Sequence, residues 1–317
     1  METDVLGAPY ESQVIDLRDD DEGSVTATLV RRRADVQTGA AVLYLHGFVD
    51  YFFQTHLADF FVARGIDFYA LDLRKHGRSL APHHSPNLCT DLTDYYEEID
   101  AAVRIIRETD GHEKLLINGH STGATTAALW AHDHRGAGLV DALLLNSAFF
   151  DLNVPWFLKN VATPIGVRVG RSRPKSTLPG ALSPVYGQSL HSTARGAWTY
   201  DLAWKPLAGF PIYAGWMRAV RTAHKRVQAG LDIPVPILSA ASTASYKGLK
   251  WGEGARSADA VLDVDHIVRW SAGLGRLVTI ARIEGGMHDL TLSAEPAREQ
   301  LFSEVSRWLT AYFPTGK

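Results

Sequence analysis

"KLLINGHSTGATTAA" occupies Lys114–Ala128 and joins a short apolar run to a run of helix-forming residues. The part through Asn118 is typical of a buried strand, and the part after Ser121 is typical of a helix. Ser121 lies between them, with one glycine two residues before it and another two residues after it. The stretch therefore predicts a strand, a tight corner that carries a serine, and a helix.

The two flanking glycines, Gly119 and Gly123, indicate why the serine lies at this corner. A side chain held out at a strand–helix turn requires a sharp, strained backbone, where bulky neighbours would clash. The turn also directs the first N–H groups of the helix at one point, which can hold negative charge. Because a serine hydroxyl is a weak nucleophile at neutral pH, this corner predicts a histidine and an acid later in the chain. The alternative is a serine that caps an ordinary helix.

Apolar runs and helix-like stretches alternate along most of the chain. This alternation is typical of a mostly parallel sheet covered by helices on both faces. Residues 10–33 instead alternate polar and apolar side chains, which predicts two edge strands. The predicted strands of the parallel part are 41–45, 67–73, 114–118, 141–146, 235–240 and 277–283, and the predicted helices are 54–64, 91–109, 121–134, 264–272 and 294–312.

The composition is that of a folded globular protein, with 317 residues, 46% of them apolar and 21% charged. The net charge of −3 gives no general reason to expect a nucleic-acid partner. Cys89 is the one cysteine, so the chain can form no internal disulfide, which fits a reducing compartment. The sequence has neither a recognisable secretion signal nor a run of eighteen apolar residues. A cytoplasmic enzyme is therefore expected.

Residues 153–230 interrupt the alternation and differ from the rest in charge. They hold eleven lysines and arginines against one acidic residue, Asp201, and four of the eight tryptophans. A basic, aromatic insertion in an acidic α/β body predicts a separate cap. We expect residues 1–152 and 231–317 to form the core and 153–230 to form the cap or lid.

His288 is the predicted base. It follows two glycines after the last predicted strand and precedes the final helix, which is the order that a serine–histidine–acid triad requires in this architecture. His266, in a predicted helix, is the next candidate. His120 adjoins the serine and is expected to point elsewhere, and His46 is expected to stabilise its own loop.

The acid is expected between the serine and the histidine, in "ARSADAVLDVDHIVRW". A carboxylate there would accept the histidine Nδ1–H and stabilise the imidazolium. Asp259 comes first and is preferred, with Asp263 second, although Asp263 is also well placed to cap the following helix. Asp265 would lie in the first helical turn, where a carboxylate is favourable without any catalytic role.

Two backbone N–H groups are expected to form an oxyanion hole. Thr122 follows the nucleophile, and Phe48 lies in "HGF", directly after an early strand. Such donors stabilise the negative charge that develops on the substrate carbonyl oxygen.

Five segments in this order resemble the α/β-hydrolase superfamily, and most closely its monoacylglycerol lipase and lysophospholipase-like branch: "LHGFVDYF", "LDLRKHGRS", "NGHSTG", "SADAVLD" and "GGMHDLTLS". The resemblance runs from about residue 40 to the C-terminus and leaves out most of the cap. It implies an α/β-hydrolase fold and ester hydrolysis through an acyl-enzyme, with no cofactor and no metal. In that branch the catalytic aspartate lies about thirty residues before the histidine, and Asp259 precedes His288 by 29. A long polar loop, "STASYKGLKWGEGARSAD", replaces the family's short link before the acid.

We therefore expect a serine hydrolase that cleaves medium-chain acyl esters or monoacylglycerol-like lipids. Trp156, Trp204 and Trp216 of the cap are expected to line an acyl pocket; alternatively, the cap aromatics form the cap's own small core. The basic cap could contact a lipid surface, or its charges could pair with the acidic body. The competing functions are another acyl-transfer activity on the same triad, such as a peptidase, thioesterase, acyltransferase or C–C hydrolase, and a non-catalytic binding module.

Overall fold

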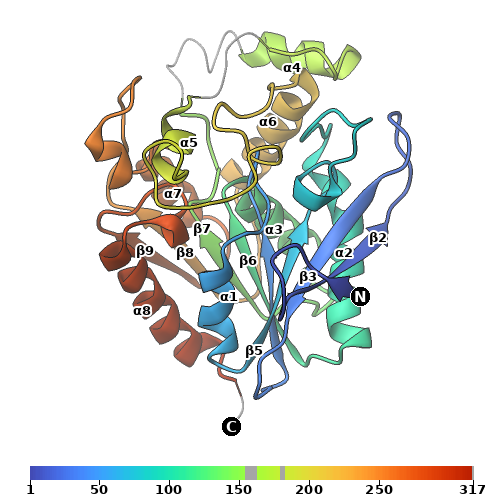
Figure 1. Ribbon diagram of the computed structural model, residues 1–317, viewed down its shortest axis with the longest axis vertical. Helices are drawn as coiled ribbons and strands as arrows, with labels where there is room; N and C mark the ends of the chain where they lie inside the picture. The colour runs from blue at the N-terminus through green and yellow to red at the C-terminus, as the bar shows by residue number, and fades with distance from the viewer. Residues whose placement is uncertain (154–162, 179–182, 316–317) are drawn as a thin grey trace.

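The computed structural model describes residues 1–153, 163–178 and 183–315. Within them, nine strands form one sheet in the order β1-β2-β3-β5-β4-β6-β7-β8-β9 (Figure 1). Strands β4 through β9 all run parallel to one another, and β3, β2 and β1 extend the sheet beyond β5, each antiparallel to its neighbour. The strands are β1 (Glu2–Thr3), β2 (Glu11–Asp16), β3 (Thr26–Arg32), β4 (Ala40–Leu45), β5 (Ile66–Asp72), β6 (Lys114–His120), β7 (Ala142–Asn146), β8 (Ile237–Ser242) and β9 (Val278–Ile283).

Helices cover both faces of this sheet, as the alternating pattern predicted (Figure 1). Because side chains alternate along a strand, β4 sends Leu43 and Leu45 into one core and Val42 and Tyr44 into the other. The first core includes α2 (Tyr96–Arg104), α3 (Thr122–Asp133) and α6 (Ala214–Gln228), and the second includes α1 (Thr55–Val62) and α8 (Glu295–Tyr312).

The differences from the predicted elements are local. The predicted helix over 91–109 is a 3-10 turn (Leu92–Tyr95), α2 and a π turn (Ile105–Thr109). The segment 10–33 forms β2 and β3 as expected, but neither is an edge strand, since β1 lies outside β2 and β3 pairs with β5. The two-residue strand β1 carries no periodic signal and was not predicted.

The described residues between β7 and β8 include α4 (Thr163–Ser172), α5 (Val185–Leu190) and α6. We call residues 153–230 the cap segment. Figure 1 shows these helices above the end of the sheet from which α3 starts. The division into core and cap domains stays a prediction. Among the described residues, none of the helices has the length and apolarity needed to cross a bilayer.

Candidate active site

The backbone at Ser121 turns as the two glycines predicted. Ser121 has φ 53° and ψ −115°, outside the helical and extended regions, and it directly precedes α3. Its side chain makes no capping hydrogen bond to the helix, so the alternative of an ordinary N-cap serine is not supported. A strained non-glycine residue of this kind is found where the surrounding structure forces the conformation, often at a functional site.

Both glycines are required by close backbone contacts. A Cβ atom at position 119 would lie 2.5 Å from the Cα of Ala124, and one at position 123 would lie 2.3 Å from the carbonyl oxygen of His46. Neither contact is with a flexible side chain that could move away. A side chain at either position would therefore force the backbone around the turn to shift.

We expect Gly123→Ala to lower the free energy of unfolding by about 1–3 kcal/mol, because the added methyl group overlaps the backbone after β4. The measurement is urea unfolding followed by circular dichroism. Gly136→Ala is the matched control, since nothing lies within 4 Å of a Cβ at that position, and its stability should stay within about 0.5 kcal/mol of the original. Equal stabilities of the two variants would contradict this account of the turn.

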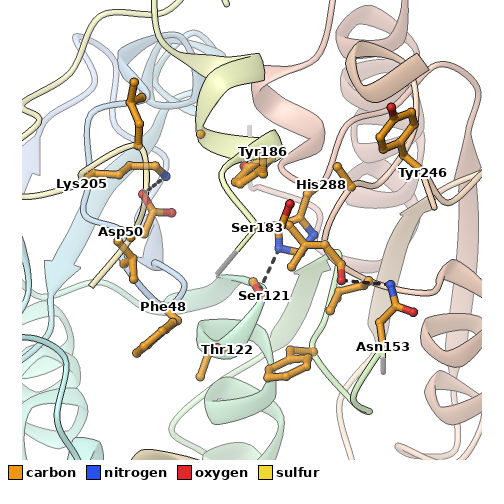
Figure 2. Close-up of a pocket in the computed structure, with 18 of the residues that line it drawn as sticks. Phe48, Asp50, Ser121, Thr122, Asn153, Ser183, Tyr186, Lys205, Tyr246 and His288 are labelled. Atoms are coloured by element: carbon orange, nitrogen blue, oxygen red, sulfur yellow. Dashed lines mark hydrogen bonds and ion pairs between the residues drawn. The ribbon is translucent and has the colours of Figure 1, made fainter. Parts of the chain in front are cut away.

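His288 lies beside Ser121, in the loop between β9 and α8. Its Nε2 is 3.0 Å from the Ser121 Oγ, and its Nδ1 is 3.0 Å from Oδ2 of Asp259 (Figure 2 shows the first contact). A carboxylate can only accept, so Nδ1 carries the proton and Nε2 is left to accept from the serine hydroxyl. All three side chains are buried, so the structure brings the predicted nucleophile, base and acid together.

Asp259, rather than Asp263, is the residue that contacts the histidine. The Oδ1 of Asp259 accepts hydrogen bonds from the backbone N–H groups of Val261 and Leu262, both at 2.8 Å, which fixes the carboxylate and leaves Oδ2 for His288. Asp263 caps α7 (Val264–Ser271), where its Oδ1 accepts from the Asp265 N–H. The sequence left the choice between these two carboxylates open, and the contacts in the structure favour Asp259.

The other histidines considered have different partners. His266 lies in α7, one turn beyond its N-cap. His46 is buried; its Nδ1–H donates to the Gly47 carbonyl and its Nε2 accepts from the Leu73 N–H. Burial lowers the pKa of His46, so the neutral ring joins two loops, which is the loop-stabilising role expected for it. His120 lines the same cavity as Ser121, with its ring centroid 5.0 Å from that of His288, and its Nδ1–H donates to Asp50.

The two predicted oxyanion donors flank Ser121. Thr122 is the first residue of α3, where backbone N–H groups lack partners within the helix. Phe48 lies in the loop after β4, and this loop passes so close that a Cβ on Gly47 would be 3.1 Å from the Cβ of Ser121. Both residues line the cavity that contains Ser121 (Figure 2). The arrangement brings two backbone segments next to the serine, and their role as an oxyanion hole stays a prediction.

The cavity over Ser121 has a volume of about 720 Å³ and also contains His288. Most of its wall is apolar, including Phe48, Phe149, Leu207, Ile212, Trp216 and Leu262. Trp216 therefore lines the cavity, as the sequence predicted. Trp204 is not among the lining residues; its ring packs edge-on against Tyr51, with the centroids 5.1 Å apart. Trp156 lies outside the described residues.

A buried ion pair in the cavity wall was not predicted. Lys205, from the cap segment, places its Nζ 2.5 Å from Oδ1 of Asp50 (Figure 2). In the sequence, Lys205 was one of eleven basic residues of the cap segment, and Asp50 was part of the segment "LHGFVDYF" with no role assigned to it. A polar residue two positions after a predicted oxyanion donor was the one available signal. Within the described ranges, no cluster of three or more side chains could hold a metal ion.

Comparisons with known proteins agree with this architecture. The model of the family described as serine aminopeptidase, S33, matches residues 37–244, which is more than half of the chain. Among curated proteins, the chain is 31% identical to the uncharacterized protein YnbC of Escherichia coli (strain K12) over 135 residues. That alignment covers 41% of this chain and only 22% of the relative's length.

Solved structures with the same fold cover nearly the whole chain. The monoacylglycerol lipase of Paleococcus ferrophilus has a TM-score of 0.67 at 19% identity and covers 90% of this chain and 99% of its own. A soluble variant of monoglyceride lipase from Saccharomyces cerevisiae has a TM-score of 0.66 at 14% identity, and the match covers 96% of this chain and 99% of that one. A highly thermostable carboxyl esterase from Bacillus coagulans has a TM-score of 0.65 at 14% identity, and the match covers 95% of this chain and 98% of that one. At these identities the likeness shows the fold, which is the predicted α/β-hydrolase fold.

Proposed function

The chain belongs to the serine aminopeptidase (S33) family of α/β hydrolases, and from this premise we propose that it hydrolyses carboxylic esters through an acyl-enzyme on Ser121. One observation carries the proposal: the continuous hydrogen-bonded series from the Ser121 hydroxyl to His288 and on to the carboxylate of Asp259, at 3.0 Å in each step. A serine hydroxyl that donates to a neutral imidazole, itself oriented by a buried carboxylate, is an activated nucleophile.

Acylation begins when His288 Nε2 accepts the hydroxyl proton as Ser121 Oγ bonds to the ester carbonyl carbon. The carbonyl oxygen becomes negatively charged and accepts hydrogen bonds from the N–H groups of Phe48 and Thr122. Asp259 stabilises the positive imidazolium through the Nδ1–H bond. The tetrahedral intermediate then collapses: the ester C–O bond breaks, and the alcohol leaves with the proton from His288 Nε2.

Deacylation repeats these steps with water as the nucleophile. His288 Nε2 accepts a proton from the water as its oxygen bonds to the acyl carbon, and the same two N–H groups stabilise the charge on the oxygen. The acyl–Oγ bond then breaks, the carboxylic acid is released, and Ser121 regains its proton from His288. No group other than the three side chains and two backbone amides is needed to balance these steps.

The cavity favours an ester with an apolar acyl chain. Aromatic and aliphatic side chains such as Phe149, Ile212 and Trp216 form most of the wall beside the serine, and a chain bound there leaves water without exposing polar groups. A volume of about 720 Å³ lies in the range of sites that enclose ligands of drug size. Medium-chain esters and monoacylglycerol-like lipids are the substrates that we propose.

The family's description also raises aminopeptidase activity, which needs a carboxylate for the substrate's free ammonium group. In the described part of the cavity wall the candidates are Asp50 and Asp263. Asp50 is paired with Lys205, and Asp263 caps α7. Since neither carboxylate is left available for an ammonium group, we favour ester over aminoacyl substrates.

We expect kcat/KM for p-nitrophenyl esters to rise from acetate to the medium chains, by about two- to fourfold for each added methylene, until the cavity is filled. Each buried CH₂ contributes about 0.8 kcal/mol, which corresponds to a factor of about four. The measurement is a chain-length series from C2 to C16, with aminoacyl p-nitroanilides and an acyl-CoA as rival substrates. Faster cleavage of the anilides or of the thioester than of any ester would overturn the proposal.

A further inference from the structure

The loop that carries Phe48 is held by side chains of the cap segment. The Phe48 ring stacks on the indole of Trp216 in α6, with centroids 3.9 Å apart and planes 27° from parallel. Two residues further on, Asp50 forms its ion pair with Lys205. Residues 48–50, which we call the oxyanion loop, are therefore contacted from the cap segment at both ends. Figure 2 shows Phe48, Asp50 and Lys205 on one side of Ser121.

The ion pair is buried and closely surrounded. Lys205 is 5% exposed and Asp50 1%. The Nζ of Lys205 also lies 5.3–5.9 Å from the ring centroids of Phe53, Tyr186 and Tyr200, within the distance at which an aromatic face attracts a cation. Removing one member of such a pair leaves an uncompensated charge in a region of low dielectric constant. The contact therefore strongly constrains where the Asp50 carboxylate can lie.

Asp50 also connects the oxyanion loop to the residue before the nucleophile. Its Oδ2 is 3.3 Å from Nδ1 of His120, which ends β6. Burial opposes ionisation of Asp50, but the Lys205 ammonium and the His120 hydrogen bond hold the pKa of this carboxyl well below its ordinary value. The carboxylate is thus charged and joins the cap segment, the oxyanion loop and the strand that leads to Ser121.

The backbone of the oxyanion loop is strained between these two attachments. Val49 has φ 52°, a region that β-branched residues rarely occupy because of steric conflict. Such a conformation persists only when neighbouring contacts impose it. The Trp216 stack and the Lys205 ion pair flank the strained residue, so they are the contacts placed to hold the Phe48 N–H in position.

We propose that the cap segment completes the oxyanion hole, with Lys205 as a positioning residue that acts through Asp50 on the Phe48 N–H. The inference rests on the proposed function, since it assigns that N–H to the substrate oxygen. Lys205 need not touch the substrate; its effect is exerted in the transition state, when negative charge develops on the carbonyl oxygen. The cap segment would then contribute to catalytic rate as well as to the acyl pocket.

The test compares the original enzyme with Lys205→Met, Asp50→Asn and the double variant. Lys225→Met is the matched control, because Lys225 is an exposed lysine of α6 in the same cap segment. For each protein, kcat and KM are measured on p-nitrophenyl butyrate and on glyceryl monobutyrate. The affinity for an alkyl trifluoromethyl ketone inhibitor and the rate of labelling by a fluorophosphonate are measured as well. Thermal unfolding and circular dichroism report whether each variant folds. The double variant has no unpaired buried charge, so it stays informative if Lys205→Met fails to fold.

We expect Lys205→Met to lower kcat about 10- to 100-fold on both esters, with KM within about threefold of the original. The affinity for the trifluoromethyl ketone and the labelling rate should fall by similar factors. Because both residues act through one contact, the double variant should be no slower than the slower single variant. Lys225→Met should match the original enzyme.

Three results would overturn the inference: kcat unchanged in a folded Lys205→Met protein, a loss confined to the glyceryl ester, or losses that multiply in the double variant. A loss confined to one alcohol would indicate direct contact with the leaving group. Failure of the proposed function looks different, since the original enzyme would then cleave neither ester. In that case, the ratio of the fluorophosphonate labelling rates of the original enzyme and Lys205→Met still tests the role of Lys205, because the phosphonyl oxygen requires the same N–H groups.

Discussion

Replacing Ser121 by alanine is expected to lower kcat for ester hydrolysis by about 10⁴- to 10⁶-fold, because it removes the hydroxyl that His288 activates. The Ser121 Oγ is the atom that His288 Nε2 contacts at 3.0 Å. Alanine removes this oxygen and leaves the backbone turn and the cavity in place. The measurement is kcat on the best p-nitrophenyl ester, with active-site concentration fixed by titration of the original enzyme.

Substrate binding serves as the control for this variant. KM or the dissociation constant of an unreactive substrate ether should change little, since the apolar wall of the cavity is intact. Ser121→Ala should also keep the circular dichroism spectrum of the original protein. A variant that retains more than about a hundredth of the activity would show that Ser121 is not the nucleophile.

The second large effect is expected at the acid. Asp259→Asn should lower kcat by about 10⁴-fold, because the amide can donate a hydrogen bond to Nδ1 and so favour the wrong histidine tautomer. Asp263→Asn is the matched comparison: it makes the same chemical change four residues later, and asparagine caps helices about as well as aspartate. Its kcat should stay within about threefold of the original.

The comparison of these two variants decides the acid directly. The expected result is a ratio of at least about 10³ between their kcat values. If Asp263→Asn were the slower of the two, the acid assignment would be wrong. The Oδ1 of Asp259 accepts hydrogen bonds from the Val261 and Leu262 N–H groups, and altering them can lower the stability of the variant. The kcat values are therefore compared at a temperature where both proteins are folded.

Much of the fold could be predicted because local signals and long-range packing agree. The parallel strands β4 to β8 are buried on both faces and appear in the sequence as nearly continuous apolar runs; β7, for instance, was expected at 141–146 and spans Ala142–Asn146. The corner at Ser121 was predictable for a similar reason. Close backbone contacts leave no room for a side chain at positions 119 and 123, so the two glycines in the sequence indicate the turn.

The position of the acid was harder to predict, because a long loop separates β8 from Asp259. In the structure this loop returns to its own start: the Asp259 N–H donates to the Ala244 carbonyl, and the Tyr246 N–H donates to the Asp259 carbonyl. The loop therefore brings Asp259 back beside the end of β8, as a short link would have done. No periodicity or turn residue in the sequence signals such a closure.

The cap segment was predicted by composition, and composition does not place individual side chains. Trp216 and Trp204 looked equivalent as cap tryptophans, yet only Trp216 lines the cavity. Lys205 was one of eleven basic cap residues expected either to contact a lipid surface or to pair with the acidic body, and nothing in the composition singled it out as the one buried against Asp50. These differences arise from tertiary packing between distant segments. Contact of the basic cap with a lipid surface stays a prediction.

The central claim is that Ser121 becomes acylated by an ester substrate, and intact-protein mass spectrometry tests it most directly. The protein is mixed with excess p-nitrophenyl butyrate, quenched in acid within the first turnovers, and digested to locate the modification. We predict a mass increase of one butyryl group on the peptide that contains Ser121, together with a burst of p-nitrophenol equal to the enzyme concentration. Ester cleavage with no acyl group on Ser121, or with the group on another residue, would contradict the account.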